Sequence, residues 1–240
     1  MNSYSFSGSA SSSKALIRLQ NVVKTYITAA GPFTALKGIN LEVFPGEFLA
    51  VTGKSGAGKT TLVNMISGTD SLTSGEVWVG DVGVHSMNSN RLAQWRGRNM
   101  GIVYQSFHLI PNLTLLENVM LPMDFCGQYH PRLSREKAID LLKEVELGEH
   151  VRKLPGEISG GQQQRVAIAR SLANDPAIIV ADEPTGRLDS LTAEVIYQIF
   201  ESLVKQGKTI VMVTHDRSMI GRVSRALEIQ DGEVIANAST

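Results

Sequence analysis

Eight consecutive residues, from Gly53 to Thr60, have the types and the spacing that a phosphate-binding loop requires. They fit the pattern G-x-x-x-x-G-K-[ST], in the order Gly53, Lys54, Ser55, Gly56, Ala57, Gly58, Lys59 and Thr60. The glycines let backbone N–H groups turn inward around a polyphosphate, and a helix that begins here adds its partial positive charge. We expect Lys59 to reach the β- and γ-phosphates and Thr60 to hold Mg²⁺. The alternative is a glycine-rich turn that binds no ligand.

The segments on either side of this loop favour the binding interpretation. Residues 48–52 form a short apolar run that predicts a buried strand, and residues 61–66 predict the start of a helix. Strand, glycine loop and helix is the arrangement in which this motif binds phosphate. We therefore include Thr61, the first residue after the motif, among those expected to contact the ligand.

Polar side chains follow three other predicted strands. Residues 101–104 lead to Gln105, residues 177–181 lead to Asp182 and Glu183, and residues 209–214 lead to His215. The runs are almost continuously apolar, as expected of parallel strands covered on both faces, and helical patterns such as residues 191–205 separate most of them. In open parallel sheets, ligands bind beyond the carboxyl ends of the strands. We therefore expect these side chains and the phosphate loop to surround one nucleotide.

Each of these side chains suits one task in nucleotide hydrolysis. We expect Asp182 to bind Mg²⁺ together with Thr60 and phosphate oxygens. Glu183 would polarise the attacking water, and His215 would donate to the γ-phosphate. Gln105 would complete the ligand shell of the metal and couple it to the residues that follow. The alternatives are structural: the two carboxylates would cap the next turn, and the histidine and glutamine would only pack.

A second candidate anion site begins at Ser159. The residues Ser159, Gly160, Gly161 and Gln162 precede a strong helix candidate over residues 163–170. Such a helix start offers free N–H groups, a hydroxyl and the positive end of the helix dipole, all of which suit a phosphate. Helices also begin at Ser or Gly for capping alone, so these residues by themselves leave both interpretations open.

Composition limits the classes of partner. The chain has 240 residues, of which 42% are hydrophobic, and this suits one α/β domain with a small insert. Lys plus Arg equals Asp plus Glu at 23 each, so no global field favours nucleic acid or an anionic membrane. The single cysteine, Cys126, excludes an internal disulfide and favours a reducing compartment. No apolar run approaches the ~18 residues of a membrane span, so any work at a membrane would depend on another chain.

The remaining pattern predicts a tail, a sheet domain and a helical insert. Residues 1–14 are rich in Ser, without the apolar core or basic start of a signal peptide, and predict a flexible tail. Residues 16–23, 39–44, 75–80, 226–229 and 233–235 predict strands of an antiparallel edge. Helices are predicted over residues 115–125 and 134–145. We expect one domain over residues 15–240, with a nucleotide-binding core (15–104 and 160–240) and a helical subdomain (105–159).

Residues 158–162, Ile-Ser-Gly-Gly-Gln, resemble the signature motif of the ATP-binding cassette (ABC) proteins. They stand ahead of a Walker B-like strand over residues 178–183, in the order of that family. Four further positions resemble the adenine-stacking aromatic, the Q-loop glutamine, the D-loop and the switch histidine of the family: Tyr26, Gln105, Asp189 and His215. The resemblance extends from about residue 16 to residue 235. Departures are few, with Ile158 where Leu is usual and Arg187 where one branch commonly has Asn.

The resemblance implies the fold and the chemistry. It implies an α/β fold with a P-loop NTPase (RecA-like) core, a mostly parallel sheet, an antiparallel β edge and a helical insert. It implies an ATPase that uses ATP and Mg²⁺, with Tyr26 stacked on adenine, although a core aromatic on an edge strand is the alternative. The signature residues of one subunit would face the phosphate loop of another across a two-fold dimer, with ATP between them. The second subunit would be the same chain or a similar ATPase, and Asp189 would join the nucleotide-contacting residues.

Several segments narrow the resemblance to one branch of the family, namely residues 107–114, 117–119, 162–170 and 182–186. That branch holds ATPase subunits of macrolide exporters, lipoprotein-release systems and the transporter-like complex of cell division. It implies a peripheral subunit on the cytoplasmic face of the cell membrane that drives an integral-membrane permease. A cell-division ATPase that moves no solute is the alternative. A third class acts on DNA or ribosomes, but it carries tandem cassettes, long coiled coils or zinc inserts, none of which this sequence shows.

One apolar stretch, residues 107–113, directly follows Gln105 and has two interpretations. It either packs in the core or forms the surface on which a cytoplasmic helix of the permease docks, near Phe107, Leu109 and Leu113.

Overall fold

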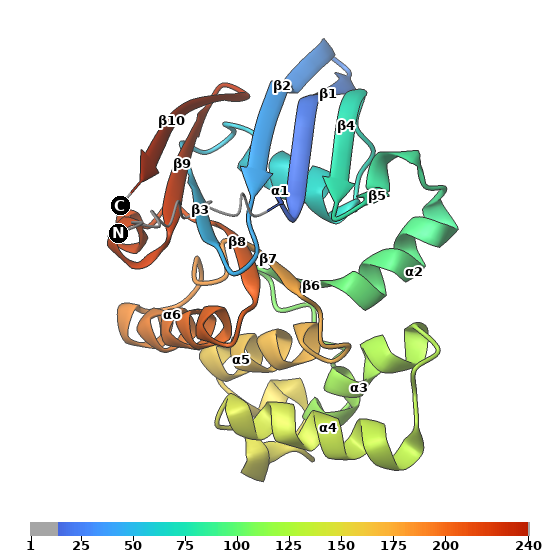
Figure 1. Cartoon of the computed structure of the whole chain (residues 1–240). Coiled ribbons are helices and arrows are strands. Elements are labelled where there is room, and N and C mark those ends of the chain that lie inside the picture. Colours follow the sequence, from blue (N-terminus) through green and yellow to red (C-terminus); the bar gives the residue numbers. More distant parts are fainter. Residues whose placement is uncertain (1–13, 240) are drawn as a thin grey trace, which may run out of the picture.

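The computed structural model describes residues 14–239, so the predicted tail, apart from Lys14, lies outside the described residues. The central sheet carries the nucleotide motifs, and Figure 1 shows its strands from β10 and β9 at the left edge of the molecule to β7 and β6 near the centre. Its strands run in the order β10 (Glu233–Ser239), β9 (Arg225–Gln230), β3 (Phe48–Thr52), β8 (Thr209–Val213), β7 (Ile178–Asp182) and β6 (Met100–Tyr104). Neighbours are parallel except for β10, which runs antiparallel to β9. The α/β class and the mostly parallel sheet are therefore confirmed.

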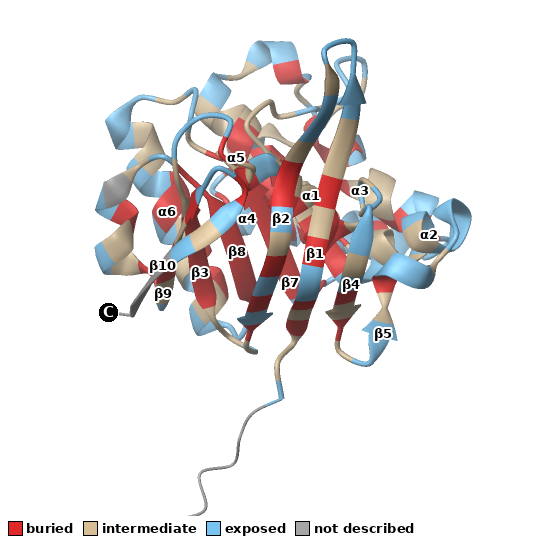
Figure 2. Ribbon diagram, turned by 90° about the horizontal axis from the view of Figure 1, so that it is seen from above, coloured by how far each residue is buried: buried red, intermediate tan, exposed pale blue. Residues whose placement is uncertain are grey.

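A second, fully antiparallel sheet lies beside the first. It contains β2 (Gly31–Val43), β1 (Ile17–Thr28), β4 (Ser74–Val79) and β5 (Val82–Gly83), in that order. Figure 2 shows β2, β1 and β4 side by side. Residues 16–23, 39–44 and 75–80 form antiparallel strands, as predicted, and these strands pair with one another and not with the central sheet. Among residues 14–239, the antiparallel edge of the central sheet is β10 alone.

The helices are α1 (Lys59–Ser67), α2 (Ser89–Asn99), α3 (Leu115–Phe125), α4 (Pro131–Glu144), α5 (Gly160–Ser171) and α6 (Ser190–Lys205). Short 3₁₀ helices are η1 (Val84–Ser86), η2 (Gly148–His150), η3 (Pro155–Glu157) and η4 (Arg217–Arg222). The predicted helix over residues 115–125 matches α3, and the one predicted from residue 134 begins earlier, with Pro131 in its first turn. Helix α2 was not predicted, because none of its residues is buried and its sequence shows no apolar stripe.

The central sheet is buried on both faces, and this sorts its side chains into two cores. On β3, Leu49 and Val51 point to a core that also contains α1 and the antiparallel sheet. Phe48 and Ala50 point to the opposite core, shared with α3, α4, α5 and α6. Side chains that alternate along a strand therefore anchor two different layers. Helix α1 lies between the two sheets (Figure 1), so both sheets determine where the phosphate loop sits.

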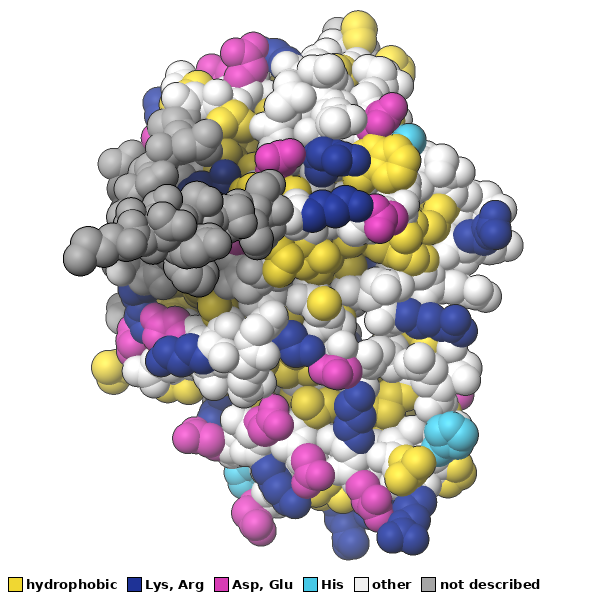
Figure 3. All heavy atoms as spheres, viewed as in Figure 1, with side chains coloured by type: hydrophobic (Ala, Val, Ile, Leu, Met, Phe, Trp, Pro, Cys, Tyr) yellow, Lys and Arg dark blue, Asp and Glu magenta, His cyan; other side chains and the backbone are white. Residues whose placement is uncertain are grey.

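Helices α3 and α4 form a lobe on the side of the central sheet away from the antiparallel sheet (Figure 1). They belong to the segment predicted as a helical subdomain, and the division of the chain into core and subdomain stays a prediction. On the face shown in Figure 3, Lys and Arg lie interspersed with Asp and Glu, in line with equal totals of the two charges. Within residues 14–239, no helix is both long enough and apolar enough to cross a bilayer.

Helix α6 offers a test of this layering. Phe200 is fully buried in the core beneath the sheet, whereas Leu191 on the same helix is 83% exposed. We expect Phe200→Ala to lower the free energy of unfolding by about 3–5 kcal/mol, because it leaves a cavity. The control Leu191→Ala should change it by less than about 0.5 kcal/mol. Urea unfolding measures both, and equal losses for the two variants would contradict the assignment of Phe200 to the core.

Candidate functional site

The phosphate loop connects β3 to α1, as predicted. Gly53, Gly56 and Gly58 have positive φ angles of 146°, 79° and 105°. A Cβ atom added at Gly53 would lie 2.2 Å from the carbonyl oxygen of Ile229 on β9. One added at Gly58 would lie 2.6 Å from the carbonyl oxygen of Ala35 on β2. Both sheets thus approach the loop too closely for side chains, and they fix its path.

Lys59 places a nearly enclosed cation at the start of α1. The residue is 7% exposed, and its Nζ donates to the carbonyl oxygens of Gly53 at 3.0 Å and Lys54 at 2.9 Å. The ammonium therefore closes the loop on itself, beside the positive end of the helix dipole. Within residues 14–239, no carboxylate lies within ion-pair distance of this Nζ. A buried cation without an anionic partner is unfavourable, so the site suits a polyphosphate.

Thr60 and Asp182 meet beside the loop. The hydroxyl of Thr60 donates to Oδ1 of Asp182, at the end of β7, over 3.2 Å. Burial raises the pKa of Asp182, and the nearby Glu183 adds to this, while Thr60 and Lys59 act in the opposite direction. Two hard oxygen donors this close fit an octahedral Mg²⁺ ion, whose adjacent ligands lie about 3 Å apart. A cation here would favour the charged form of Asp182.

Glu183 and His215 lie at the same edge of the sheet. The N–H of Glu183 donates to the carbonyl oxygen of Val213, at the end of β8, over 2.9 Å. Its Oε2 lies 3.4 Å from Nδ1 of His215, whose side chain is largely exposed. Glu183 has a φ of 46°, in the left-handed region that non-glycine residues rarely adopt. The structure therefore brings the water-polarising and phosphate-contacting candidates together.

Gln105 lies at the same edge but turns toward the loop that follows Glu183. Its predecessor Tyr104 is the register partner of Asp182. The Nε2 of Gln105 lies 2.7 Å from the position that a Cβ atom on Gly186 would occupy. Within the described residues, its side chain makes no hydrogen bond to Thr60 or Asp182. Its expected place in the metal shell stays a prediction.

Tyr26 lies on β1 beside the phosphate loop. Its hydroxyl donates to Oδ2 of Asp70 over 2.9 Å, and Lys24 Nζ lies 4.7 Å from the centroid of its ring. Lys24 also forms an ion pair of 2.9 Å with Asp70. Burial raises the pKa of Tyr26, and a hydrogen-bond interaction with Thr61, in the first turn of α1, partly offsets this. The ring is therefore held in place next to residues of the loop.

The candidate signature residues form the start of α5. The hydroxyl of Ser159 accepts from the Gln162 N–H at 3.3 Å, and the side chain of Gln162 accepts from the Ser159 N–H at 3.0 Å. A Cβ atom on Gly161 would lie 2.1 Å from Cγ2 of Thr192, so α5 and α6 approach closely here. Asp189 caps α6 by accepting from the Thr192 N–H at 3.0 Å.

The signature residues and the phosphate loop stay apart within one chain. No hydrogen bond or ion pair in the described part of the chain joins residues 159–162 or Asp189 to residues 53–61. The structure thus gathers Lys59, Thr60, Asp182, Glu183 and His215 at one edge of the sheet, and it leaves the second candidate anion site exposed elsewhere.

Some residues that support the site were not predicted. Gln164 on α5 contacts both the end of β6 and the segment after Glu183, and Tyr197 on α6 links the segments that follow Glu183 and His215. Asp70 anchors both Lys24 and Tyr26. These contacts join residues distant in sequence. The sequence signals these residues only weakly, as polar side chains within a helical pattern, and such a signal does not identify the residue that they contact.

The close approach at Gly53 generates a prediction. Gly53→Ala should lower ATP affinity by more than about tenfold, because the added methyl group displaces the loop from β9. The matched control is Gly56→Ala, where a Cβ atom meets nothing within 4 Å and only the left-handed backbone is disfavoured. Calorimetric titration of both variants measures the difference. A Gly53→Ala variant that binds ATP as tightly as Gly56→Ala would contradict the steric account.

Sequence comparisons agree with the expected family. A family model described as "ABC transporter" matches residues 36–186. An uncharacterized ABC transporter ATP-binding protein of Thermotoga maritima is 44% identical over 221 residues, which cover 92% of this chain and 94% of that protein. A macrolide export ATP-binding/permease protein, MacB, of Bartonella henselae is 40% identical over 93% of this chain. The chain spans only 34% of the length of this MacB.

The structural comparison agrees. A dimeric structure of MJ0796, described as a bacterial ABC transporter cassette, superposes with a TM-score of 0.85 at 43% identity. It covers 93% of this chain and 98% of the other. A second MJ0796 structure, a post-hydrolysis state bound to ADP and Pi, gives a TM-score of 0.86 at 42% identity. The resemblance drawn from the sequence motifs is therefore confirmed: the chain belongs to the ABC transporter family and is an ATP-binding cassette ATPase.

Proposed function

We propose that the chain is the ATPase subunit of an ABC transporter, which dimerises on ATP and drives a separate membrane permease of the macrolide-export or lipoprotein-release type. The observation that carries this is the group at one sheet edge: Lys59, Thr60, Asp182, Glu183 and His215. The MacB relatives, whose names join an ATP-binding part to a permease, support the partner class. The subunit would then lie peripherally on the cytoplasmic face of the cell membrane.

The side chains at this edge of the central sheet have different roles in ATP hydrolysis. The loop N–H groups and Lys59 bind the β- and γ-phosphates, and Tyr26 stacks on the base. Thr60 and Asp182 supply two oxygen ligands for Mg²⁺, which neutralises charge on the phosphates when bound. Glu183 orients the attacking water and accepts its proton. His215, near the carboxylate of Glu183, donates to the γ-phosphate and responds to its loss.

The separation of the two anion sites supports dimerisation. The exposed start of α5 offers free N–H groups. Among residues 14–239, the phosphate loop of the same chain makes no hydrogen bond to it, so a phosphate bound there would have to come from the loop of another chain. A two-fold dimer would place Ser159 of each copy against the phosphates held by Lys59 of the other, and both sites would be satisfied at once. The dimeric state described for MJ0796 supports this arrangement. Loss of the γ-phosphate would then open the pair and deliver motion to the permease.

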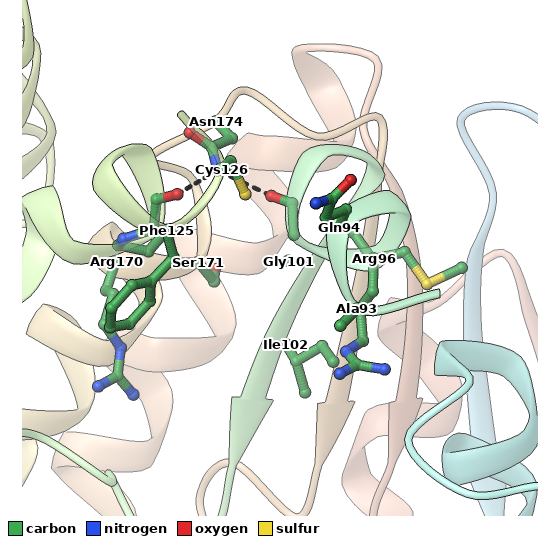
Figure 4. Close-up of a pocket in the computed structure, with 13 residues that line it drawn as sticks. Ala93, Gln94, Arg96, Gly101, Ile102, Phe125, Cys126, Arg170, Ser171 and Asn174 are labelled. Atoms are coloured by element: carbon green, nitrogen blue, oxygen red, sulfur yellow. Dashed lines mark hydrogen bonds between the residues drawn. The ribbon is translucent and has the colours of Figure 1, made fainter. Parts of the chain in front are cut away.

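An apolar groove offers the permease a docking surface. It lies between α2, β6, α3 and α5, and Figure 4 shows Phe125 and Ile102 among its lining residues. Phe125 is 78% exposed. Residues 107–113, the apolar stretch after Gln105, fit this role less well, because Leu109 packs against the core shared with α3, α4, α5 and α6. Arg170 lines the groove and donates to the carbonyl oxygen of Phe107 over 2.8 Å, so the groove is linked to the segment after Gln105.

The catalytic assignment generates one prediction. Glu183→Gln keeps shape and hydrogen-bonding capacity but removes the charge that activates water. ATP binding should survive, while turnover falls by at least ~10²-fold. Light scattering in the presence of ATP should show a trapped dimer. A variant with normal turnover would make Glu183 a structural carboxylate.

A companion variant tests the shared site within that dimer. Ser159→Arg places a bulky cation where the phosphates of the other copy would lie. In the Glu183→Gln background it should abolish the ATP-dependent dimer, while each monomer still binds nucleotide through its own loop. Unchanged dimerisation would show that Ser159 does not face the nucleotide of a second copy.

The groove generates a further prediction. Phe125→Glu should weaken co-purification with the permease by at least about tenfold, because an exposed apolar side chain that the permease would cover becomes a charge. Basal ATPase activity of the free subunit should stay within about twofold. The control is Leu133→Glu on α4, an exposed leucine outside the groove. Normal assembly of the Phe125→Glu variant would place the docking surface elsewhere.

A further inference from the structure

We propose that Gln164 is a positioning residue for Glu183, and that it acts together with Tyr197 by holding the two residues that follow this carboxylate. The inference rests on the proposed function, because it assigns to Glu183 the activation of water. Neither Gln164 nor Tyr197 is among the residues that contact phosphate, metal or base in the account above.

Gln164 lies inside the molecule and contacts the end of β6 and the segment that follows Glu183. It is completely buried on α5. Its Nε2 donates to the carbonyl oxygen of Pro184 at 2.6 Å and to that of Tyr104 at 3.2 Å. The two amide hydrogens therefore bond to two backbone carbonyls: that of Pro184, directly after Glu183, and that of Tyr104, directly before Gln105.

The other half of this amide makes no hydrogen bond within residues 14–239. Oε1 of Gln164 is buried and has no hydrogen-bond partner among the described residues. Leaving a buried acceptor unpaired is unfavourable, and the hydrogen bonds that Nε2 makes offset this cost by pairing two backbone carbonyls. The two bonds made by Nε2 offer a reason for a glutamine here, and both hold the site.

The backbone of Glu183 needs such support. Its φ of 46° lies in the left-handed region, which a side chain with a Cβ atom disfavours. A conformation of this kind persists only where the surroundings determine it. On one side, the Glu183 N–H is fixed by Val213. On the other side, Gln164 fixes the carbonyl of Pro184.

Tyr197 anchors the next residue from α6. Its buried hydroxyl lies 2.8 Å from the hydroxyl of Thr185 and donates to Oδ2 of Asp216 over 3.1 Å. Asp216 directly follows His215. The residues after Glu183 are thus held by α5 and by α6, and the second anchor also reaches the segment that carries the histidine.

The contacts predict a specific kinetic effect. Gln164→Met preserves length and apolar packing but removes both donors. In single-turnover assays with radiolabelled ATP, the rate of hydrolysis should fall about tenfold while the KM for ATP changes by less than twofold. The matched control is Gln163→Met on the same helix, because Gln163 donates to Pro155 and Ile158, away from the edge. That control should retain at least half of the parent rate.

A double-mutant cycle separates positioning from general structural damage. If Gln164 acts through Glu183, adding Gln164→Met to Glu183→Gln should lower the residual rate by less than twofold. Tyr197→Phe removes one hydroxyl and should show the same dependence on Glu183, which keeps the test open if Gln164→Met fails to fold. An equal fold-loss in both backgrounds, or a KM that rises with the loss of rate, would overturn the inference. The proposed function fails separately, if Glu183→Gln alone hydrolyses ATP as fast as the parent.

Discussion

The enclosed ammonium of Lys59 is the constraint on which the arrangement of this molecule depends. A cation with so little access to water is stable only if oxygen atoms surround it, and within the described chain the loop provides only its own carbonyls at hydrogen-bond distance. The loop must therefore curl tightly, which requires positive φ angles at three of its glycines. The loop that accommodates the lysine also has the form that suits a polyphosphate.

The two sheets can be understood from this requirement. The central sheet brings the ends of β7 and β8 beside the loop, and with them Asp182, Glu183 and His215. In the antiparallel sheet, the backbone of Ala35 lies close to Gly58, and Tyr26 lies near the first turn of α1. Burial raises the pKa of Asp182, and the neighbouring carboxylate of Glu183 raises it further. Such a site would gain from a cation, and this is the electrostatic argument for the Mg²⁺ ion that we propose here.

Sequence reasoning succeeded where the chemistry is local. The phosphate loop and the polar residues at strand ends could be predicted, because each depends on neighbours in sequence and on the general geometry of parallel sheets. It failed where partners are distant. The pairing of β1 with β4, the anchoring of Tyr26 by Asp70 and the contact of Gln164 with Tyr104 join residues separated by tens of positions. Helix α2 was not predicted, because none of its residues is buried and its sequence therefore lacks apolar periodicity.

The claim that a buried charge organises the phosphate site is tested most directly by calorimetric titration of ATP into the parent chain and into Lys59→Met. Methionine keeps most of the length of lysine and removes only the ammonium. The account predicts one ATP bound per parent chain, and an affinity for Lys59→Met that is lower by at least about tenfold, the loss expected for one charge-assisted contact. Equal affinities for the two proteins would contradict it, because the phosphates would then be held without the charge around which the loop is built.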